Sequence, residues 1–524
     1  MDKKTRVKNI IAIILLLLGN LIYFLTLWMT RKYDKVSLDQ FIYNLKASAA
    51  GANSSLMNSA YVRVGVFGIG TTLIEIFLYL LVVGKFERYT KRLATFMGRT
   101  AKGVCRHLKQ LAQYIHRLPW KRFFLFLSRH VLPISMAVLL FACTFFLTKL
   151  GVPEYVNKKT TESDFIEKNY VDPNSVKIMF PEEKRNVVYI FLESFEVTFA
   201  ETEAGGPIVE NYLPEMTELA DTYINFSNDD GLGGALSFYG TTWTAAAMVT
   251  QTSGVIMEVP LNANNYGGDE IYMPGLTSIG EILADNGYTN TLLVGSNAEF
   301  HGREDYFEDH GNYDIIDTES LKEEGRLPED YDVWWGFEDA KLYDYAKEEL
   351  TRLAQQDEPF NFTMLTCDTH FPNGYVCELC QDDYNAQYPN VVRCSSRQLT
   401  DFILWIQEQP FYENTTIVIC GDHLTMDPDF MQGVDGEYQR TIYNCIINSA
   451  VEPKQEKNRL FGTYDMMPTT LAAMGATIAG ERLGLGTNLF SSKKTLTEEY
   501  GFEVVDAEFQ KKSTFYNQTF LGIS

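Results

Sequence analysis

The chain has 524 residues and a formal net charge of −23, enough length for one large domain and a membrane part. Residues 1–150 carry 22 Lys and Arg against 5 Asp and Glu, whereas residues 151–524 carry 23 against 63. The uneven charge predicts two parts in different environments. The acidic part lacks the basic surface that nucleic acids need, so we expect no nucleic acid among the partners.

Three apolar segments lie in the basic part, at about residues 10–29, 64–84 and 131–147. Each is near the roughly 20 residues that a helix needs to cross a hydrocarbon core of about 30 Å. The loop at 85–129 holds twelve Lys and Arg and a single acid, so the positive-inside rule assigns it to the cytoplasm. Residues 1–150 are therefore predicted to form a multi-pass anchor in membrane lipid, with the later residues on the opposite face.

After a polar juxtamembrane linker at 151–185, apolar runs alternate with helical patterns. The predicted strands are Asn186–Leu192, Thr289–Val294, Phe360–Leu365, Thr415–Cys420 and Arg440–Ile447. The predicted helices are Thr244–Thr252, Leu276–Asn286, Ala340–Leu353, Ser396–Gln409 and Met466–Met474. This order favours an α/β domain at 186–490 with a mainly parallel central sheet covered by helices on both faces. A C-terminal extension follows at 491–524.

Four side chains with oxygen or nitrogen ligand atoms stand where predicted elements begin or end. Glu193 and the pair Asp422-His423 each follow a strand, and Thr244 begins a helix after the glycine-rich stretch 231–240. Ligands gather beyond the carboxyl ends of parallel strands, so these residues can converge. Carboxylate, hydroxyl and imidazole groups suit one divalent metal, and a metal-bound hydroxyl can become a nucleophile.

Simpler roles remain open for single members of this set. Glu193 could cap a helix, and Thr244 could be an N-cap, with Thr241 and Thr242 as neighbouring candidates for the nucleophile. Six cysteines follow residue 150, an even number that favours disulfides outside the cytoplasm. Cys377 and Cys380 are spaced like half of a zinc ribbon, but no second such pair exists in the sequence.

Several motifs in chain order together resemble one family. They are Asn-Val-Val-Tyr-Ile-Phe-Leu-Glu193-Ser, Trp243-Thr244-Ala-Ala-Ala-Met, Asp368-Thr-His370-Phe-Pro, Gly421-Asp422-His423 and Tyr464-Asp465-Met-Met-Pro468-Thr469. The set is similar to the lipoteichoic acid synthase and phosphoglycerol transferase family of the alkaline phosphatase and sulfatase superfamily. Within this family, it most resembles the transferases that modify periplasmic glucans. The resemblance covers roughly residues 186–491.

The resemblance implies a sulfatase-like fold with a metal site and a nucleophile. The implied metal ligands are Glu193, Thr244, Asp422 and His423, and the ion is Mn²⁺ first, with Mg²⁺ or Zn²⁺ as alternatives. Thr244 is the implied nucleophile and His370 the second catalytic residue. The implied substrate-binding residues are Arg303, His370, His301 and Trp243. By the same resemblance, Cys380 is expected to pair with Cys394, and Cys367 with Cys377.

The implied reaction moves glycerol phosphate from phosphatidylglycerol to a cell-envelope glycan or glycerol-phosphate polymer. It would pass through a phosphothreonine-type intermediate, on the extracytoplasmic face of a bacterial inner membrane. A phosphoethanolamine transferase is disfavoured because no histidine follows His423. A sulfatase or phosphatase-type hydrolase is disfavoured because the stretch after Thr244 lacks the Pro and Arg of the sulfatase motif. The alternative outside enzymology is an inactive receptor for envelope polysaccharide.

Overall fold

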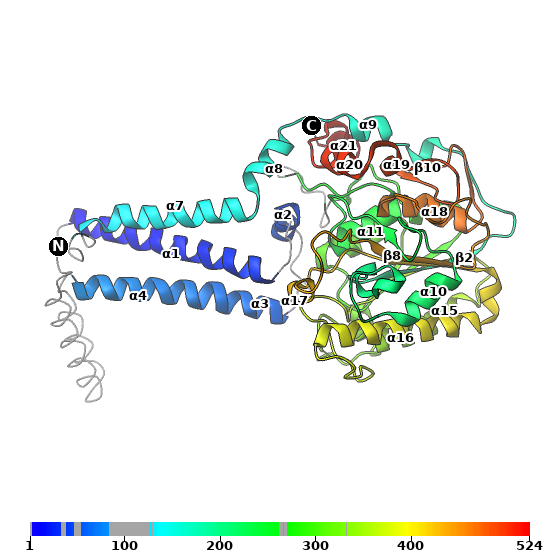
Figure 1. Ribbon diagram of the computed structural model, residues 1–524, viewed down its shortest axis with the longest axis horizontal. Coiled ribbons are helices and arrows are strands. Elements are labelled where there is room, and N and C mark those ends of the chain that lie inside the picture. Colours follow the sequence, from blue (N-terminus) through cyan, green and yellow to red (C-terminus); the bar gives the residue numbers. More distant parts are fainter. Residues whose placement is uncertain are drawn as a thin grey trace. The chain divides into compact units, whose positions relative to one another are not determined.

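The computed structural model describes residues 3–32, 38–46, 54–82, 126, 129–260, 266, 270–331 and 333–523 (Figure 1). The chain divides into two compact units. One contains Met1–Lys32 and Ser54–Pro153, and the other contains Tyr33–Asn53 and Glu154–Ser524. The basic loop predicted at 85–129 lies outside the described residues, apart from Phe126 and Arg129.

The first unit is helical. Its elements are α1 (Lys3–Lys32), α3 (Ser54–Ala60), η1 (Tyr61–Val66), α4 (Phe67–Val82) and α7 (Val131–Lys149). Within the described residues, three helical stretches are long and apolar enough to cross a membrane: Thr5–Lys32, Met57–Leu80 and Val131–Lys149. They coincide with the three predicted apolar segments.

Polar and small side chains join these helices. Asn20 of α1 donates to Glu75 Oε2 of α4 at 2.9 Å and to Thr72 Oγ1 at 3.0 Å. The acidic side chain of Glu75 thus has a partner on the neighbouring helix, which lowers the cost of a polar group among apolar residues. Gly19 permits a close approach to α7, since a Cβ there would lie 3.2 Å from the Leu139 backbone.

The second unit is built on a seven-stranded sheet in the order β3-β8-β7-β2-β6-β4-β5. The strands are β2 (Asn186–Leu192), β3 (Gly234–Ala235), β4 (Thr289–Val294), β5 (Asp314–Ile316), β6 (Phe360–Leu365), β7 (Thr415–Gly421) and β8 (Ile442–Ile447). The central strand β2 runs parallel to β6 and β7, and β4 runs parallel to β6 and β5. Only β8 and β3 pair antiparallel, at one edge. The predicted mainly parallel sheet is confirmed.

Helices cover both faces of this sheet (Figure 1). On one face lie α11 (Thr244–Ser253), α12 (Ile279–Asp285) and α18 (Met466–Ala473), and on the other lie α10 (Pro214–Thr222), α15 (Asp339–Leu353) and α16 (Gln387–Gln407). Successive side chains of β2 alternate between the two cores, with Tyr189 in the first and Ile190 in the second. Both residues are buried, which explains why β2 is a continuous apolar run.

The remaining helices and strands are short. The helices are α8 (Val152–Lys159), α9 (Phe165–Asn169), α13 (Arg303–Asp309), α14 (Thr318–Glu323), α17 (Pro428–Met431), α19 (Leu496–Tyr500), α20 (Phe502–Phe509) and α21 (Thr514–Thr519). The strands are β1 (Ile178–Met179), β9 (Thr477–Ile478), β10 (Arg482–Leu483) and β11 (Gly486–Thr487). The strands form two small antiparallel pairs, β1 with β9 and β10 with β11.

Two helix starts differ from their predicted positions by more than one residue. Helix α12 begins at Ile279 because Ser278 forms a capping box with Glu281, which ends the extended chain there. Helix α16 begins at Gln387, well before the predicted Ser396. Pro389 lies in its first turn, where a missing backbone N–H costs nothing, so the proline does not interrupt the helix.

A short helix between the first two apolar helices belongs to the second unit. It is α2 (Leu38–Lys46), and its Tyr43 is fully buried. The Tyr43 hydroxyl lies 3.1 Å from that of Tyr272, and its ring meets the edge of Tyr266 at 5.7 Å. Lys46 Nζ donates to the Pro260 carbonyl at 2.6 Å. The segment that joins the first two apolar helices is therefore part of the globular unit.

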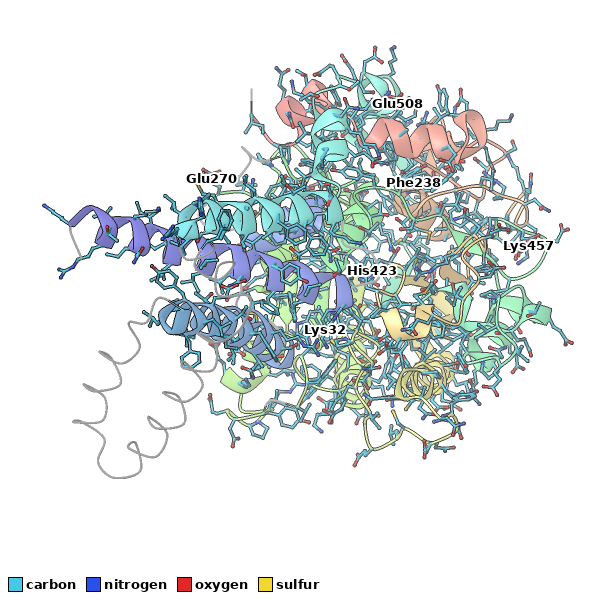
Figure 2. All side chains as sticks on the ribbon, turned by 60° about the vertical axis from the view of Figure 1, so that its left-hand side comes forward. Lys32, Phe238, Glu270, His423, Lys457 and Glu508 are labelled. Atoms are coloured by element: carbon cyan, nitrogen blue, oxygen red, sulfur yellow. The ribbon has the colours of Figure 1, made fainter. Side chains whose placement is uncertain are left out.

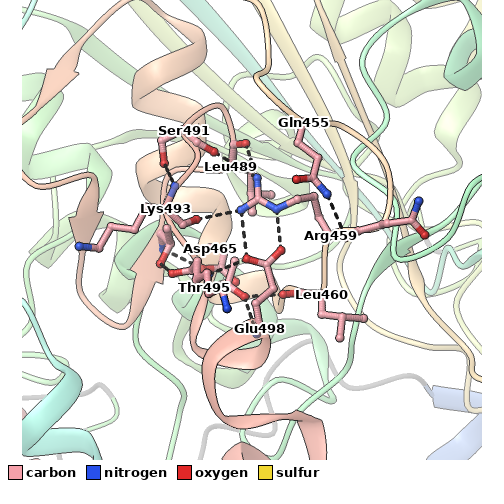
Figure 3. Close-up of polar contacts among 12 residues, drawn as sticks. Gln455, Arg459, Leu460, Asp465, Leu489, Ser491, Lys493, Thr495 and Glu498 are labelled. Carbon is pink, nitrogen blue, oxygen red and sulfur yellow. Dashed lines mark hydrogen bonds and ion pairs between the residues drawn. The ribbon is translucent and has the colours of Figure 1, made fainter.

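The C-terminal segment completes the first of the two cores. Phe509, Tyr516 and Phe520 are buried in it. A buried ion pair fastens the segment, since Arg459 Nε donates to Glu498 Oε1 at 2.6 Å (Figure 3). The same guanidinium donates to the backbone carbonyls of Leu489, Ser491 and Lys493 at 2.9, 3.2 and 3.1 Å.

Candidate metal and nucleophile site

Three chain segments bring the predicted site residues together at the carboxyl ends of the central strands. Glu193 directly follows β2, and Asp422 and His423 directly follow β7. Because β2 and β7 are adjacent parallel strands with Leu192 opposite Gly421, their carboxyl ends coincide. Thr244 is the first residue of α11. The three segments meet although 51 and 179 residues of sequence separate Thr244 from Glu193 and His423.

The four side chains are in mutual contact and buried. Thr244 Oγ1 donates to Glu193 Oε2 at 3.2 Å and lies 3.4 Å from His423 Nε2. The same Nε2 lies 3.4 Å from Asp422 Oδ2 and 3.6 Å from Glu193 Oε1. Thr244 is 8% exposed and the other three are 0% exposed. His423 is labelled in Figure 2. The structure thus brings together all four residues of the predicted metal site.

Hydrogen bonds fix the direction of each ligand atom. Asp422 Oδ1 accepts from the backbone N–H groups of Ser194 and His423 at 2.7 and 2.6 Å. Asp422 Oδ2 is buried and has no hydrogen-bond partner within the described part of the chain. His423 Nδ1 faces the Leu424 carbonyl at 2.9 Å. A carbonyl only accepts, so Nδ1 carries the hydrogen and the Nε2 lone pair faces the other ligands.

These donors fit a divalent cation. Burial, together with the nearby Asp422 carboxylate, raises the pKa of Glu193. The carboxylates of Glu193 and Asp422 are both buried, with ligand atoms within 4.8 Å of each other. Such a pair needs a compensating positive charge. Oxygen and imidazole donors directed into one space suit Mn²⁺, Mg²⁺ or Zn²⁺. Glu193, Asp422 and His423 each offer a ligand atom within 4.8 Å of the others, as one ion requires.

Three buried polar residues that the sequence did not indicate hold this site in place. Thr366 Oγ1 accepts from the Glu193 N–H at 3.0 Å, and Thr369 Oγ1 donates to the Glu193 carbonyl at 2.6 Å. Gln251 of α11 donates to the Gly421 carbonyl at 2.9 Å. Gln251 lies in the last turn of α11 among Thr250, Thr252 and Ser253, so its sequence context did not set it apart.

Arg303 and His370, two predicted substrate-binding residues, lie beside the ring of Trp335. Arg303 is 2% exposed and donates through Nε and Nη2 to Phe300 O, Ser296 Oγ and Asn297 O at 3.0, 2.9 and 2.6 Å. Its guanidinium carbon lies 5.3 Å from the Trp335 ring centre, which lies 4.2 Å from that of His370. These contacts hold both polar groups in fixed positions.

Each of these two residues also presents a free polar atom. Arg303 Nη1 and His370 Nδ1 are buried and make no hydrogen bond to any residue that the structure describes. Burial lowers the pKa of His370, an effect that the Glu193 charge opposes. Burial likewise lowers the pKa of Arg303, again opposed by nearby acidic groups that include Glu193. Arg303 and His370 therefore share an electrostatic environment with the candidate metal site.

His301 and Trp243 belong to an aromatic layer. His301, in η5 (Phe300–Gly302), has a φ of 58° and stacks on Phe300 at 3.8 Å between ring centres. Burial lowers its pKa to about 3, helped by the Arg303 charge, so the imidazole is neutral at pH 7. Tyr43 of α2 meets the edge of His301 at 5.3 Å and lies 5.9 Å from Trp243.

Tyr43 and Trp335 are two aromatic residues near this site that were not predicted from the sequence. Tyr43 lies between two apolar segments, where only a contact remote in sequence gives it a role. Trp335 lies in a loop, and the adjacent pair Trp334-Trp335 is the one local signal for it. A loop that carries two such large apolar side chains must pack them against another element.

The two expected disulfides are not formed in the structure. Cys367, Cys377, Cys380 and Cys394 are all free thiols. Cys377 Sγ lies 3.7 Å from Cys380 Sγ and 3.8 Å from Cys394 Sγ. The three thiols therefore form a cluster, and their distances do not single out one pair as a disulfide.

Comparisons with known proteins agree with the fold. A family model described as Sulfatase matches residues 185–476. Phosphoglycerol transferase I of Salmonella choleraesuis is 29% identical over 321 residues, which cover 60% of this chain and 40% of that protein. Phosphoglycerol transferase I of an Escherichia coli strain is 28% identical over 331 residues, which cover 62% and 41%. The chain thus matches about two fifths of the length of these relatives.

A solved structure shares the fold across most of the chain. The lipooligosaccharide phosphoethanolamine transferase A of Neisseria meningitidis, an integral membrane protein, has a TM-score of 0.50 and 14% identity. The match covers 89% of this chain and 84% of that one. The lipoteichoic acid synthase LtaP of Listeria monocytogenes gives a TM-score of 0.47 and 16% identity, over 62% and 80% of the two chains.

Proposed function

The chain belongs to the sulfatase family, and from that membership we propose that it transfers glycerol phosphate from phosphatidylglycerol to an envelope glycan or glycerol-phosphate polymer. The observation that carries the proposal is the convergence of Glu193, Asp422 and His423 on the hydroxyl of Thr244. The similarity to proteins named phosphoglycerol transferase I supports the choice of transferred group. The phosphoryl transferase class follows from both.

Glu193, Thr244, Asp422 and His423 are the proposed ligands of one divalent metal. When bound, such an ion lowers the pKa of a ligated hydroxyl and offsets charge on phosphoryl oxygens. The rest of the site prepares for the same chemistry. Thr244 is at the start of α11, where backbone N–H groups and the helix dipole favour an anionic oxygen or a phosphate.

In the proposed first step, Thr244 Oγ1 attacks the phosphorus of the donor lipid. Its proton leaves along the hydrogen bond to Glu193 Oε2, and the bond between phosphorus and the diacylglycerol oxygen breaks. His370 supplies a proton to that oxygen from Nδ1. Arg303 Nη1 donates to a phosphoryl oxygen, because it is the guanidinium nitrogen without a hydrogen-bond partner in the described part of the chain.

In the second step, an acceptor hydroxyl attacks the phosphoglycerol group on Thr244. The bond between Thr244 Oγ1 and phosphorus breaks, and the proton that Glu193 took in the first step returns to that oxygen. His370 takes the proton of the acceptor hydroxyl as a base, which restores the proton that it gave up in the first step. The two steps together exchange one phosphodiester for another, so no outside energy source is required.

We propose that residues 154–524 lie on the extracytoplasmic face of a bacterial inner membrane. The three apolar helices and the basic composition of the loop at 85–129 support this orientation. Helix α2 adds support, because it follows the first apolar helix and belongs to the same globular unit as Thr244. Helix α2 and residues 154–524 must therefore lie on the same side of the membrane.

This orientation predicts which cysteine an impermeant maleimide reaches in intact cells. Position 492 is exposed, so Ser492→Cys should be labelled above the background of the parent protein. Lys102→Cys, in the basic loop, is the matched control and should react only after the cells are lysed. Labelling of Lys102→Cys but not Ser492→Cys in intact cells would show that the orientation is reversed.

The transfer itself is tested with the full chain in detergent and phosphatidylglycerol labelled in its head group. We expect labelled glycerol phosphate on an added glucan or glycerol-phosphate acceptor, with release of diacylglycerol, detected by mass spectrometry. Phosphatidylethanolamine as donor should give much less product. A preference for phosphatidylethanolamine would instead support a phosphoethanolamine transferase, and release of free glycerol phosphate whether or not acceptor is present would support a hydrolase.

A further inference from the structure

A cluster of three cysteines lies on residues that the proposed reaction does not use. Cys377 and Cys380 are in the segment that connects β6 to α16, and Cys394 is in α16 itself. Their Sγ atoms all lie within 4.8 Å of one another. Cys377 and Cys394 are buried, and Cys380 is partly exposed. We name Cys377, Cys380 and Cys394 the thiol cluster.

We propose that the thiol cluster binds one metal ion of the thiolate-preferring class, of which Zn²⁺ is the representative. The sulfur–sulfur distances are 3.7 Å from Cys377 to Cys380 and 3.8 Å from Cys377 to Cys394. Zinc–thiolate bonds of roughly 2.3 Å at tetrahedral angles separate two sulfur ligands by about 3.8 Å. Two of the three sulfur pairs are therefore already spaced as ligands of one tetrahedral ion, and the third pair lies within 4.8 Å.

The side chain of Gln398 supplies a second observation. Its Nε2 lies 3.3 Å from Cys394 Sγ and 3.7 Å from Cys377 Sγ. Its Oε1 is buried and finds no hydrogen-bond partner among residues 3–523 where these are described. The two ends of a carboxamide have nearly the same shape, so a half-turn of the amide would direct Oε1 at the sulfur atoms. Gln398 Oε1 can then fill the fourth coordination position of the ion. A water molecule that enters beside the partly exposed Cys380 can fill it instead.

The arrangement favours an ion over a disulfide. Cys377 is almost equally close to the two other thiols, so the geometry selects no pair. A bridge between any two would also leave the third thiol in contact with it, where thiol–disulfide exchange is easy. An ion uses all three sulfur atoms and offsets the charge of their thiolate forms.

An ion at this place would position His370. The segment between β6 and α16 carries His370 and then Cys377, and the segment is held to α16 through Gln387, whose Nε2 donates to Gly374 O at 2.9 Å. A metal bond from Cys377 and Cys380 to Cys394 would add a second attachment to the same helix. Closing such a loop lowers its conformational freedom. We assign the thiol cluster a structural role, separate from the candidate metal site around Thr244.

Cobalt(II) titration of the reduced, metal-free full chain tests this proposal directly. A thiolate bound to Co²⁺ gives an intense charge-transfer absorption, which the candidate metal site cannot produce because it contains no sulfur. We expect this absorption to appear in the parent protein, in Glu193→Gln and in the matched control Cys445→Ser, whose cysteine is buried on β8 away from the cluster. Cys377→Ser and Cys394→Ser should each lose it. Failure of the lipid assay would leave this result unaffected, so the two proposals can fail separately.

A second measurement needs no variant. Zn²⁺ should slow alkylation of the partly exposed Cys380 in the reduced parent protein about tenfold or more, as ligation removes the free thiolate. Unchanged alkylation, or absence of the charge-transfer absorption, would overturn the proposal. Peptide mapping without reductant that finds a disulfide within the thiol cluster of the isolated protein would overturn it too, in favour of the bridge expected from the sequence.

Discussion

Thr244→Ala is expected to lower the transfer rate by three or more orders of magnitude, a loss of the order seen when a covalent nucleophile is removed. The variant should remain folded, because alanine is a good helix former and Thr244 begins α11. It should also retain metal, since Glu193, Asp422 and His423 keep their mutual contacts. Turnover of phosphatidylglycerol, metal content and thermal unfolding of the purified variant would be measured together.

The neighbouring threonines separate a chemical effect from a local structural one. Thr242 is partly buried, and Thr242→Ala is the matched control that should retain transfer. Thr241 is less suitable, because its hydroxyl donates to Phe238 O at 2.8 Å and accepts from Phe238 N at 3.1 Å. Thr244→Ser should retain part of the rate, as it keeps a hydroxyl at the same reach. If Thr244→Ala were active and no phosphorylated threonine formed, direct attack by the acceptor on the lipid phosphate would replace the two-step route.

Asp422→Ala is expected to lose both metal and transfer. The substitution removes one of the two negative charges in the candidate metal site and also Oδ2, which has no hydrogen-bond partner among the described residues. It also removes Oδ1, which accepts from the N–H groups of Ser194 and His423 at 2.7 and 2.6 Å. At the same free metal concentration, the purified variant should bind at least about tenfold less metal than the parent protein, as measured by metal analysis.

Asp422→Asn is the matched variant, because it keeps the shape and an acceptor oxygen while it removes the charge. Without metal it should unfold at a higher temperature than the parent, because the repulsion with Glu193 that contributes to the raised pKa of that residue is relieved. With metal the order should reverse, since only the parent gains the full binding free energy. Equal metal-induced shifts in both proteins would mean that Asp422 is not a ligand.

Local sequence signals were strong enough to predict the sheet and the residues at the ends of its strands. The strands β2, β4 and β6 begin and end at their predicted residues, since each is a short run composed mostly of β-branched, aromatic and aliphatic residues. Glu193 and Asp422 directly follow two such runs, which is why the site could be located before the fold was known. The contribution of Tyr43 could not be predicted in this way, because it depends on a contact with His301, 258 residues away.

The thiol cluster shows how one misplaced helix start hides a site. The predicted helix began at Ser396, which left Cys394 in a loop with no defined direction. Helix α16 in fact begins at Gln387, so Cys394 and Gln398 are four residues apart in the same helix and lie on one face. Both then meet Cys377. The spacing of Cys377 and Cys380 and the expected pairing of Cys380 with Cys394 were available from the sequence, but the grouping of all three thiols beside Gln398 was not.

The placement of the C-terminal helices sets an order on folding. Residues 496–521 follow all seven strands of the central sheet in the sequence, yet they fill the core beside Phe238 and Tyr170. During synthesis of the chain the sheet can form first, but this apolar surface stays uncovered until Phe520 is available to pack on it. The incomplete domain is then a target for chaperones and proteases, and the delay before these residues pack sets how long it is at risk.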